Sequence, residues 1–145
     1  MGFFDSMNVS ASALTAERLR MDVISKNIAN ANVTRTANGG PSRRQMVVFQ
    51  AGDERPFSEY LNEASKNKVG GGVRVAGIIE DTTAFKEVYD PSHPDADSKG
   101  YVKMPNVDIM AEMIDMITAT RAYEANVTAI NNTKTMAMKA LDIGR

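Results

Sequence analysis

The sequence predicts an α+β fold in which two long terminal α-helices pack as an antiparallel, coiled-coil-like pair, with a small β-rich insert between them. Three observations predict it. Apolar residues recur at helical spacing near the start of the chain, they recur without interruption near its end, and the middle is rich in turn residues and short β-favouring runs. We therefore divide the chain into residues 1–32, the N-terminal helix of a core domain, residues 33–105, the β-rich insert domain, and residues 106–145, the C-terminal helix of the same core domain.

The longest uninterrupted pattern predicts a helix from Val107 to Ile143, because neither Pro nor Gly occurs in it. Asn106 after Pro105, followed by acidic residues in the first turn, marks its predicted start. Apolar side chains alternate at steps of four and three residues along one face, and the candidate packing residues are Met113, Met116, Tyr123, Val127, Ile130 and Leu141. At about 1.5 Å per residue the helix is roughly 55 Å long, more than the width of a compact domain of this size. Other chains are therefore expected to cover part of it.

A second long helix is predicted from an N-cap at Asp5 or Ser6 to about Ala31. Its apolar residues recur mainly at a spacing of seven, and the candidate packing residues are Met7, Leu14, Met21, Ile24, Ile28 and Asn30. Because the insert leaves one helix and returns to the other, the two helices are predicted to run antiparallel. Partners should then have residue numbers that sum to roughly 140 to 148, which brings Leu14 near Ile130.

Two stretches inside the predicted helices carry no charge at all, Ser6 to Ala16 and Ala125 to Thr133. A helix face in water usually carries Lys and Glu, whereas small uncharged residues suit close packing. The alternative is that both stretches are weak solvent-facing parts of a soluble helix. We favour burial against other chains, and Ala129, which lies off the apolar face at helical spacing, is a candidate intersubunit contact.

The insert is predicted to contain three short strands, Gln45 to Gln50, Val73 to Ile79 and Thr83 to Tyr89. The second and third strands are expected to form a hairpin through the turn at residues 80–82. Between the first two strands, Asp53 to Gly72 is polar and ends in three glycines, which predicts an exposed loop with a short helical turn near residues 58–65.

No residue pattern predicts a catalytic, cofactor-binding or metal-binding site. The net charge of −1, from 17 basic and 18 acidic residues, provides no basic surface for nucleic acid, and the lack of cysteine excludes a disulfide framework. The single histidine, His93, lies between Asp90 and Asp97, where a divalent metal is the alternative to a structural turn. The spacing matches neither an EF-hand nor a zinc motif, and two prolines favour the turn. We therefore expect no enzyme activity and no cofactor.

The sequence also lacks the patterns that direct a chain into or through a membrane by the common routes. Its first residues have neither the basic segment nor the apolar core of a secretory signal, and no stretch approaches the roughly 18 apolar residues of a transmembrane helix. Direct membrane insertion is therefore not expected. If the protein leaves the cytoplasm, it is expected to do so without a cleaved signal peptide.

Several segments resemble the bacterial flagellar axial proteins. In the front helix the resemblance lies in Arg18 to Asn30. It continues in Val88 to Asp97, which contains the run His-Pro-Asp-Ala-Asp, and in Gly100 to Val107, which reads Tyr-Val-Lys-Met-Pro-Asn-Val after the glycine. Arg121 to Asn126, with the sequence Arg-Ala-Tyr-Glu-Ala-Asn, completes it in the last helix. The resemblance covers nearly the whole chain. Two of its segments, Val88 to Asp97 and Gly100 to Val107, are similar to those of the proximal rod members of the family.

This resemblance implies a structural subunit of the proximal rod of the bacterial flagellar basal body, which polymerises helically around the export channel and transmits torque. The implied partners are copies of itself, neighbouring rod proteins, an adaptor to the membrane ring, and the flagellar type III export apparatus that delivers it to the periplasm. Nucleic acid is not an implied partner. A helical adaptor that does not polymerise, or another axial component of the rod or hook, is the alternative.

Overall fold

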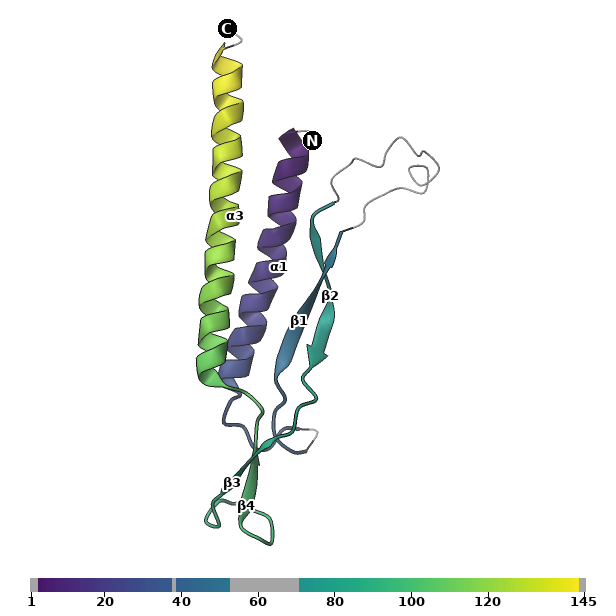
Figure 1. Cartoon of the computed structure of the whole chain (residues 1–145), viewed down its shortest axis with the longest axis vertical. Coiled ribbons are helices and arrows are strands. Elements are labelled where there is room, and N and C mark those ends of the chain that lie inside the picture. The colour runs from purple at the N-terminus through teal and green to yellow at the C-terminus, as the bar shows by residue number, and fades with distance from the viewer. Residues whose placement is uncertain (1–2, 38, 53–70, 144–145) are drawn as a thin grey trace, which may run out of the picture.

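The computed structural model describes residues 3–37, 39–52 and 71–143. Its elements, in chain order, are α1 (Phe3–Ala29), β1 (Gln45–Ala51), β2 (Val73–Glu80), β3 (Lys86–Tyr89), β4 (Tyr101–Met104) and α3 (Ile109–Ile143). The two helices lie side by side, β1 and β2 run alongside α1, and β3 and β4 lie beyond the end at which the insert joins the helices (Figure 1). The predicted α+β fold with two long terminal helices is confirmed. None of the helices described is both long and apolar enough to cross a membrane.

The helix starts differ from those predicted by a few residues. Asp108 is the N-cap of α3, because its Oδ1 accepts hydrogen bonds from the backbone N–H groups of Met110 at 3.0 Å and Ala111 at 3.4 Å. Asn106, the predicted start signal, instead accepts a hydrogen bond from the backbone N–H of Arg44 through its Oδ1, at 2.9 Å. At the other end of the chain α1 begins at Phe3, so Asp5 lies inside the first turn, where a carboxylate compensates the helix dipole. The predicted N-cap at Asp5 or Ser6 is therefore wrong.

The antiparallel pairing of the helices is confirmed. Thr120 Oγ1 donates to Met21 Sδ at 3.6 Å, and the residue numbers 21 and 120 sum to 141. Nearer the junction with the insert, Asn27 Nδ2 donates to Glu112 Oε2 at 2.9 Å. Because α3 is longer than α1, it continues past the N-terminal end of α1, and its last turns have no helix of their own chain beside them (Figure 1).

The helix register makes a direct prediction for cross-linking. In the double variant Leu14→Cys, Ile130→Cys, we expect an intrachain disulfide on mild oxidation, because the register places the two positions at the same level of the helix pair. The chain has no other cysteine, so a mobility shift on a non-reducing gel of dilute protein reports this bond alone. Leu14→Cys, Val107→Cys is the control and should stay reduced. Cross-linking of the control pair in place of the first would reject this register.

The insert consists of two separate antiparallel ribbons. In one, β1 pairs with β2 from Gln45 opposite Glu80 to Ala51 opposite Val73, with an irregularity after Val48. In the other, β3 pairs with β4, and Tyr89 lies opposite Tyr101. The first two strands were predicted, and the third predicted strand, Thr83 to Tyr89, contains β3, which begins only at Lys86. β4 was missed because its four residues, shortly before the last helix, read as the entrance to that helix.

The predicted hairpin between the second and third strands is wrong. Asp81, the residue after β2, donates its backbone N–H to the carbonyl oxygen of Arg44 at 2.8 Å, and its own carbonyl accepts hydrogen bonds from Arg43 and Asn106. These bonds tie the end of β2 to the junction and direct the chain away from β2, so β3 finds its partner in β4. Most of the predicted loop from Asp53 to Gly72, including its helical turn near residues 58–65, lies outside the described residues.

The segment around His93 is a structural turn. His93 Nδ1 accepts a hydrogen bond from the backbone N–H of Asp95 at 3.1 Å. The hydrogen bond from the Ser92 hydroxyl holds the pKa of the Asp90 carboxyl below its ordinary value, and the backbone N–H of Tyr101 does the same for the pKa of Asp97. Within residues 3–37, 39–52 and 71–143, no three His, Asp or Glu side chains are grouped so that they could hold a metal ion.

Candidate assembly site

The helices and the insert meet at one group of charged and amide side chains, which we call the polar node: Asn27, Arg44, Gln45, Glu112 and Asp115. Glu112 lies at its centre and is only 1% exposed. Arg44 Nε donates to Glu112 Oε1 at 2.6 Å, and Arg44 Nη2 donates to Asp115 Oδ2 at 3.2 Å. Because Asn27 of α1 also donates to the second oxygen of Glu112, both carboxylate oxygens are satisfied by different segments of the chain.

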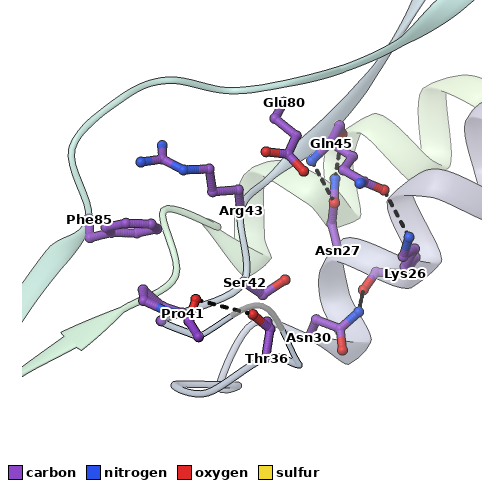
Figure 2. Close-up of a pocket in the computed structure, with 12 residues that line it drawn as sticks. Lys26, Asn27, Asn30, Thr36, Pro41, Ser42, Arg43, Gln45, Glu80 and Phe85 are labelled. Atoms are coloured by element: carbon purple, nitrogen blue, oxygen red, sulfur yellow. Dashed lines mark hydrogen bonds between the residues drawn. The ribbon is translucent and has the colours of Figure 1, made fainter.

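Asn27 also binds the insert directly. Its Nδ2 donates to the carbonyl oxygen of Gln45 at 2.8 Å, and the backbone N–H of Gln45 donates to Asn27 Oδ1 at 2.9 Å, so the amide acts as a short continuation of the sheet edge (Figure 2). Lys26 Nζ adds a hydrogen bond to Gln45 Oε1 at 3.0 Å. At the opposite end of the β1–β2 ribbon, Ser12 of α1 binds β2, because its Oγ accepts a hydrogen bond from the backbone N–H of Val73 at 3.0 Å. The first ribbon is thus tied to α1 at two levels.

The electrostatics of the node favour the charged form of Arg44. The hydrogen bond to Glu112 raises the pKa of Arg44 above its ordinary value, against the opposing effect of burial, and the charges of Asp115 and Asp81 raise it further. Hydrogen bonds from the backbone and side chain of Thr83 lower the pKa of Asp81. The node therefore works as a structural clamp between three segments. A polar cavity beside it carries both signs of charge on Lys26, Arg43 and Glu80, which favours no one class of ligand (Figure 2).

The contact between α1 and α3 is built from small and polar residues. Ala119 of α3 is completely buried, Ile24 and Asn27 of α1 are buried as well, and so is Ala31 just after the end of α1. On α3 the buried and half-buried positions recur at steps of four and three, at Glu112, Met116, Ala119, Tyr123, Asn126, Ile130, Thr133 and Ala137. Half of this line coincides with the predicted apolar line. The other half lies one residue earlier than predicted, at Glu112, Ala119, Asn126 and Thr133. The reason is that small side chains along the contact allow the backbones of the two helices to approach each other closely.

The predicted packing residues are distributed over three environments. Ile24 is buried. Those that are half-buried are Met7, Leu14, Met21, Ile28, Asn30, Met116, Tyr123, Val127 and Ile130. Those that are exposed are Met113, Ala129 and Leu141. The structure therefore brings most of these residues to the edge of the helix pair rather than to its closest contact.

Several of these residues, together with Thr120, form a continuous surface that we call the shared flank, along one side of the α1–α3 contact. Its residues are Met7, Leu14, Met21 and Ile28 of α1, with Met113, Thr120 and Val127 of α3. The contact between Met21 and Thr120 joins the two rows. The first ribbon packs on a different side of α1, where Ser12, Ala16, Val23 and Asn27 recur, so it leaves the shared flank uncovered.

A second uncovered surface runs along α3 on the side turned away from α1, and we call it the outer stripe. Its residues are all exposed and recur at steps of three or four up to Met136, with one further residue two turns later: Met110, Ile114, Ile117, Arg121, Ala125, Ala129, Asn132, Met136 and Ile143. Met110 is 69% exposed, Ile114 63% and Ile143 87%. Exposed apolar surface of this extent is typical of a protein interaction site.

Two families of known proteins match the chain, one at each of its terminal helices. Residues 7–35, within and just after α1, match the profile described as "Flagella basal body rod protein", and residues 98–143, which include β4 and α3, match "Flagellar basal body rod FlgEFG protein C-terminal". Fold and matches together define a flagellar basal-body rod protein.

Relatives that match over the whole chain give the family. The chain is 53% identical to the flagellar basal-body rod protein FlgC of Bacillus subtilis, with all of both chains covered. It is 50% identical to FlgC of Borreliella burgdorferi, over 99% of this chain and 98% of the relative, and 40% identical to FlgC of Escherichia coli over both full lengths. The chain belongs to the FlgC family of flagellar basal-body rod proteins. It is accordingly a structural protein and not an enzyme.

Proposed function

We propose that the chain polymerises helically, with copies of itself and with neighbouring rod proteins, to form part of the proximal rod around the export channel. The observation that carries this proposal is that the helix pair leaves two apolar surfaces uncovered, the shared flank and the outer stripe. A monomeric soluble protein seldom leaves such long apolar rows in water. Both surfaces run along helices, as expected if helices pack side by side in the wall of a tube.

The two surfaces differ in composition and lie on different sides of the helix pair. A contact between unlike surfaces does not close on itself as a twofold dimer does, and it adds subunits without limit unless a ring forms. An open helical wall is the natural product. The polar node would then keep the insert at a fixed orientation to that wall, so that torque passes from one subunit to the next through many shallow contacts.

The remaining part of the proposal concerns location and delivery. We infer that the chain reaches the periplasm through the flagellar type III export apparatus and that, at the base of the rod, an adaptor connects it to the membrane ring. The support is the name that its relatives carry, flagellar basal-body rod protein, together with the resemblance of the sequence to the axial proteins. Long helices with weakly packed ends also suit passage in an unfolded state.

Electron microscopy of basal bodies tests this function. An epitope inserted into the segment 53–68, in a strain that lacks the untagged chain, should be decorated by antibody-coupled gold on the rod of isolated basal bodies, close to the membrane ring. Untagged basal bodies provide the background. Motile cells whose tagged protein stays wholly in the soluble fraction would contradict a role in the rod and would favour a helical adaptor.

A further inference from the structure

A carboxylate with an incomplete set of partners, that of Glu17, borders the shared flank. Glu17 lies on α1 three residues after Leu14 and four before Met21. Its Oε2 is shut off from water and accepts no hydrogen bond within the described part of the chain. The nearest cation is Arg20, whose Nη1 lies 3.8 Å from that oxygen and whose Nη2 is 3.7 Å from Asp115. The Glu17 side chain is still 16% exposed, so part of it lies at the surface of the helix pair.

The outer stripe contains the opposite charge. Arg121 lies between Ile117 and Ala125, and it is exposed. It forms no ion pair with any residue that the structure describes. Because the outer stripe is turned away from α1, Arg121 lies on the far side of α3 from Glu17 of its own chain. The outer stripe thus contains an exposed cation, Arg121, and the shared flank is bordered by a carboxylate with too few partners, Glu17.

We propose that the outer stripe of one copy packs on the shared flank of a second copy, and that Arg121 of the first donates to the Glu17 carboxylate of the second. This inference rests on the proposed polymerisation and names the two surfaces that make the contact. Three features of the structure favour a second copy as the occupant. Both surfaces are apolar rows on helices, their central charges are opposite, and the shared flank is continuous with the α1–α3 contact, so a third helix would extend that packing.

The size of the contact agrees with a protein that assembles only in a polymer. A helix face about 40 Å long and 10 Å wide presents roughly 400 Å². This is about half of the area per partner, roughly 800 Å², that a stable two-chain complex buries. One such contact is therefore weak between isolated monomers. In a helical wall each copy makes it twice, once with each surface, and other neighbours add further area.

A charge exchange tests the pairing. Glu17→Arg and Arg121→Glu should each lower the number of rods on isolated basal bodies by about tenfold or more, because like charges then face each other across the contact. The double variant Glu17→Arg, Arg121→Glu should recover to within about threefold of the unchanged chain, because the ion pair is rebuilt with reversed polarity. Glu17→Gln should assemble, since its amide oxygen still accepts from Arg121. Lys99→Glu, an equal charge reversal at an exposed position in the β3–β4 turn, is the control and should assemble normally.

Two further measurements keep the result interpretable. Urea unfolding of each purified variant shows whether a single substitution acts by unfolding the monomer, because Glu17→Arg also places a second cation beside Arg20. Leu14→Cys in one tagged copy and Ala125→Cys in a differently tagged copy should cross-link to each other in assembled rods. A double variant that assembles no better than the weaker single variant, with no such cross-link, would overturn the pairing. If gold labelling still places the unchanged chain on the rod, the proposed function survives that result.

Discussion

Arg44→Met lowers the free energy of unfolding of the isolated chain by about 3 kcal/mol, because it leaves the Glu112 carboxylate buried without its cation. Glu112 is 1% exposed, so water cannot replace the guanidinium without opening the junction. Met is unbranched, apolar and close to Arg in volume, so the substitution removes the charge and the hydrogen bonds while most of the space stays filled. Three segments lose contacts together, since Arg44 also binds Asp115 and approaches Asp81.

Urea unfolding followed by circular dichroism measures this effect. The matched control is Arg74→Met, because Arg74 is exposed on β2 and, among the described residues, donates one side-chain hydrogen bond, to Gln50. We expect the control to change the unfolding free energy by less than about 0.5 kcal/mol. A loss below about 1 kcal/mol for Arg44→Met would mean that water or another cation satisfies Glu112, and the polar node would not be the clamp that joins the insert to the helices.

The second large effect is expected on assembly rather than on folding. Ala129→Glu places a charge and extra volume in the outer stripe, at a position that is exposed in the single chain. Burial of an unpaired carboxylate between subunits costs several kcal/mol, about 3 per contact. The helix itself tolerates the change, since Glu is a good helix former. We therefore expect a soluble, exported protein with an unchanged circular dichroism spectrum, no rods and no motility.

Ala37→Glu is the matched control for this substitution, because Ala37 is also exposed but lies in the segment between α1 and β1. Motility in soft agar and negative-stain images of basal bodies provide the two readouts, and an immunoblot of the culture fluid or periplasm reports export. Motile cells with intact rods in the Ala129→Glu strain would show that this face of α3 stays in water. The uncharged stretch from Ala125 to Thr133 would then be a weakly polar surface.

The sequence predicted both helices and their antiparallel pairing because these features depend on local and regular signals. No Pro or Gly interrupts α3, and the large apolar residues of α1 recur every seven positions. Only about half of the α3 positions that face α1 were predicted. A reading of apolar spacing selects Met113, whereas the structure buries Glu112 and Ala119, because close helix approach depends on small side chains and on a buried ion pair.

The polar node was not predicted, since its members are far apart in the sequence. No spacing indicates that Asn27, Arg44 and Glu112 meet. One signal was present. Asn27 and Glu112 are polar residues on the two helix faces that contact each other, and buried polar groups require hydrogen-bond partners. The same long-range hydrogen bonds explain the failed hairpin, because Asp81 is bound by Arg43 and Asn106.

The central claim is that the outer stripe of α3, exposed in the single chain, is covered in the rod. Cysteine reactivity measures this most directly. In Ile114→Cys, whose native side chain is 63% exposed, the thiol should react rapidly with a maleimide in the purified monomer and at least about tenfold more slowly in isolated basal bodies. Ala37→Cys provides the reference rate in both states, because it lies outside the two proposed surfaces. Protection of position 114 relative to position 37 is the predicted result, and equal reactivity of Ile114→Cys in monomer and rod would contradict the account.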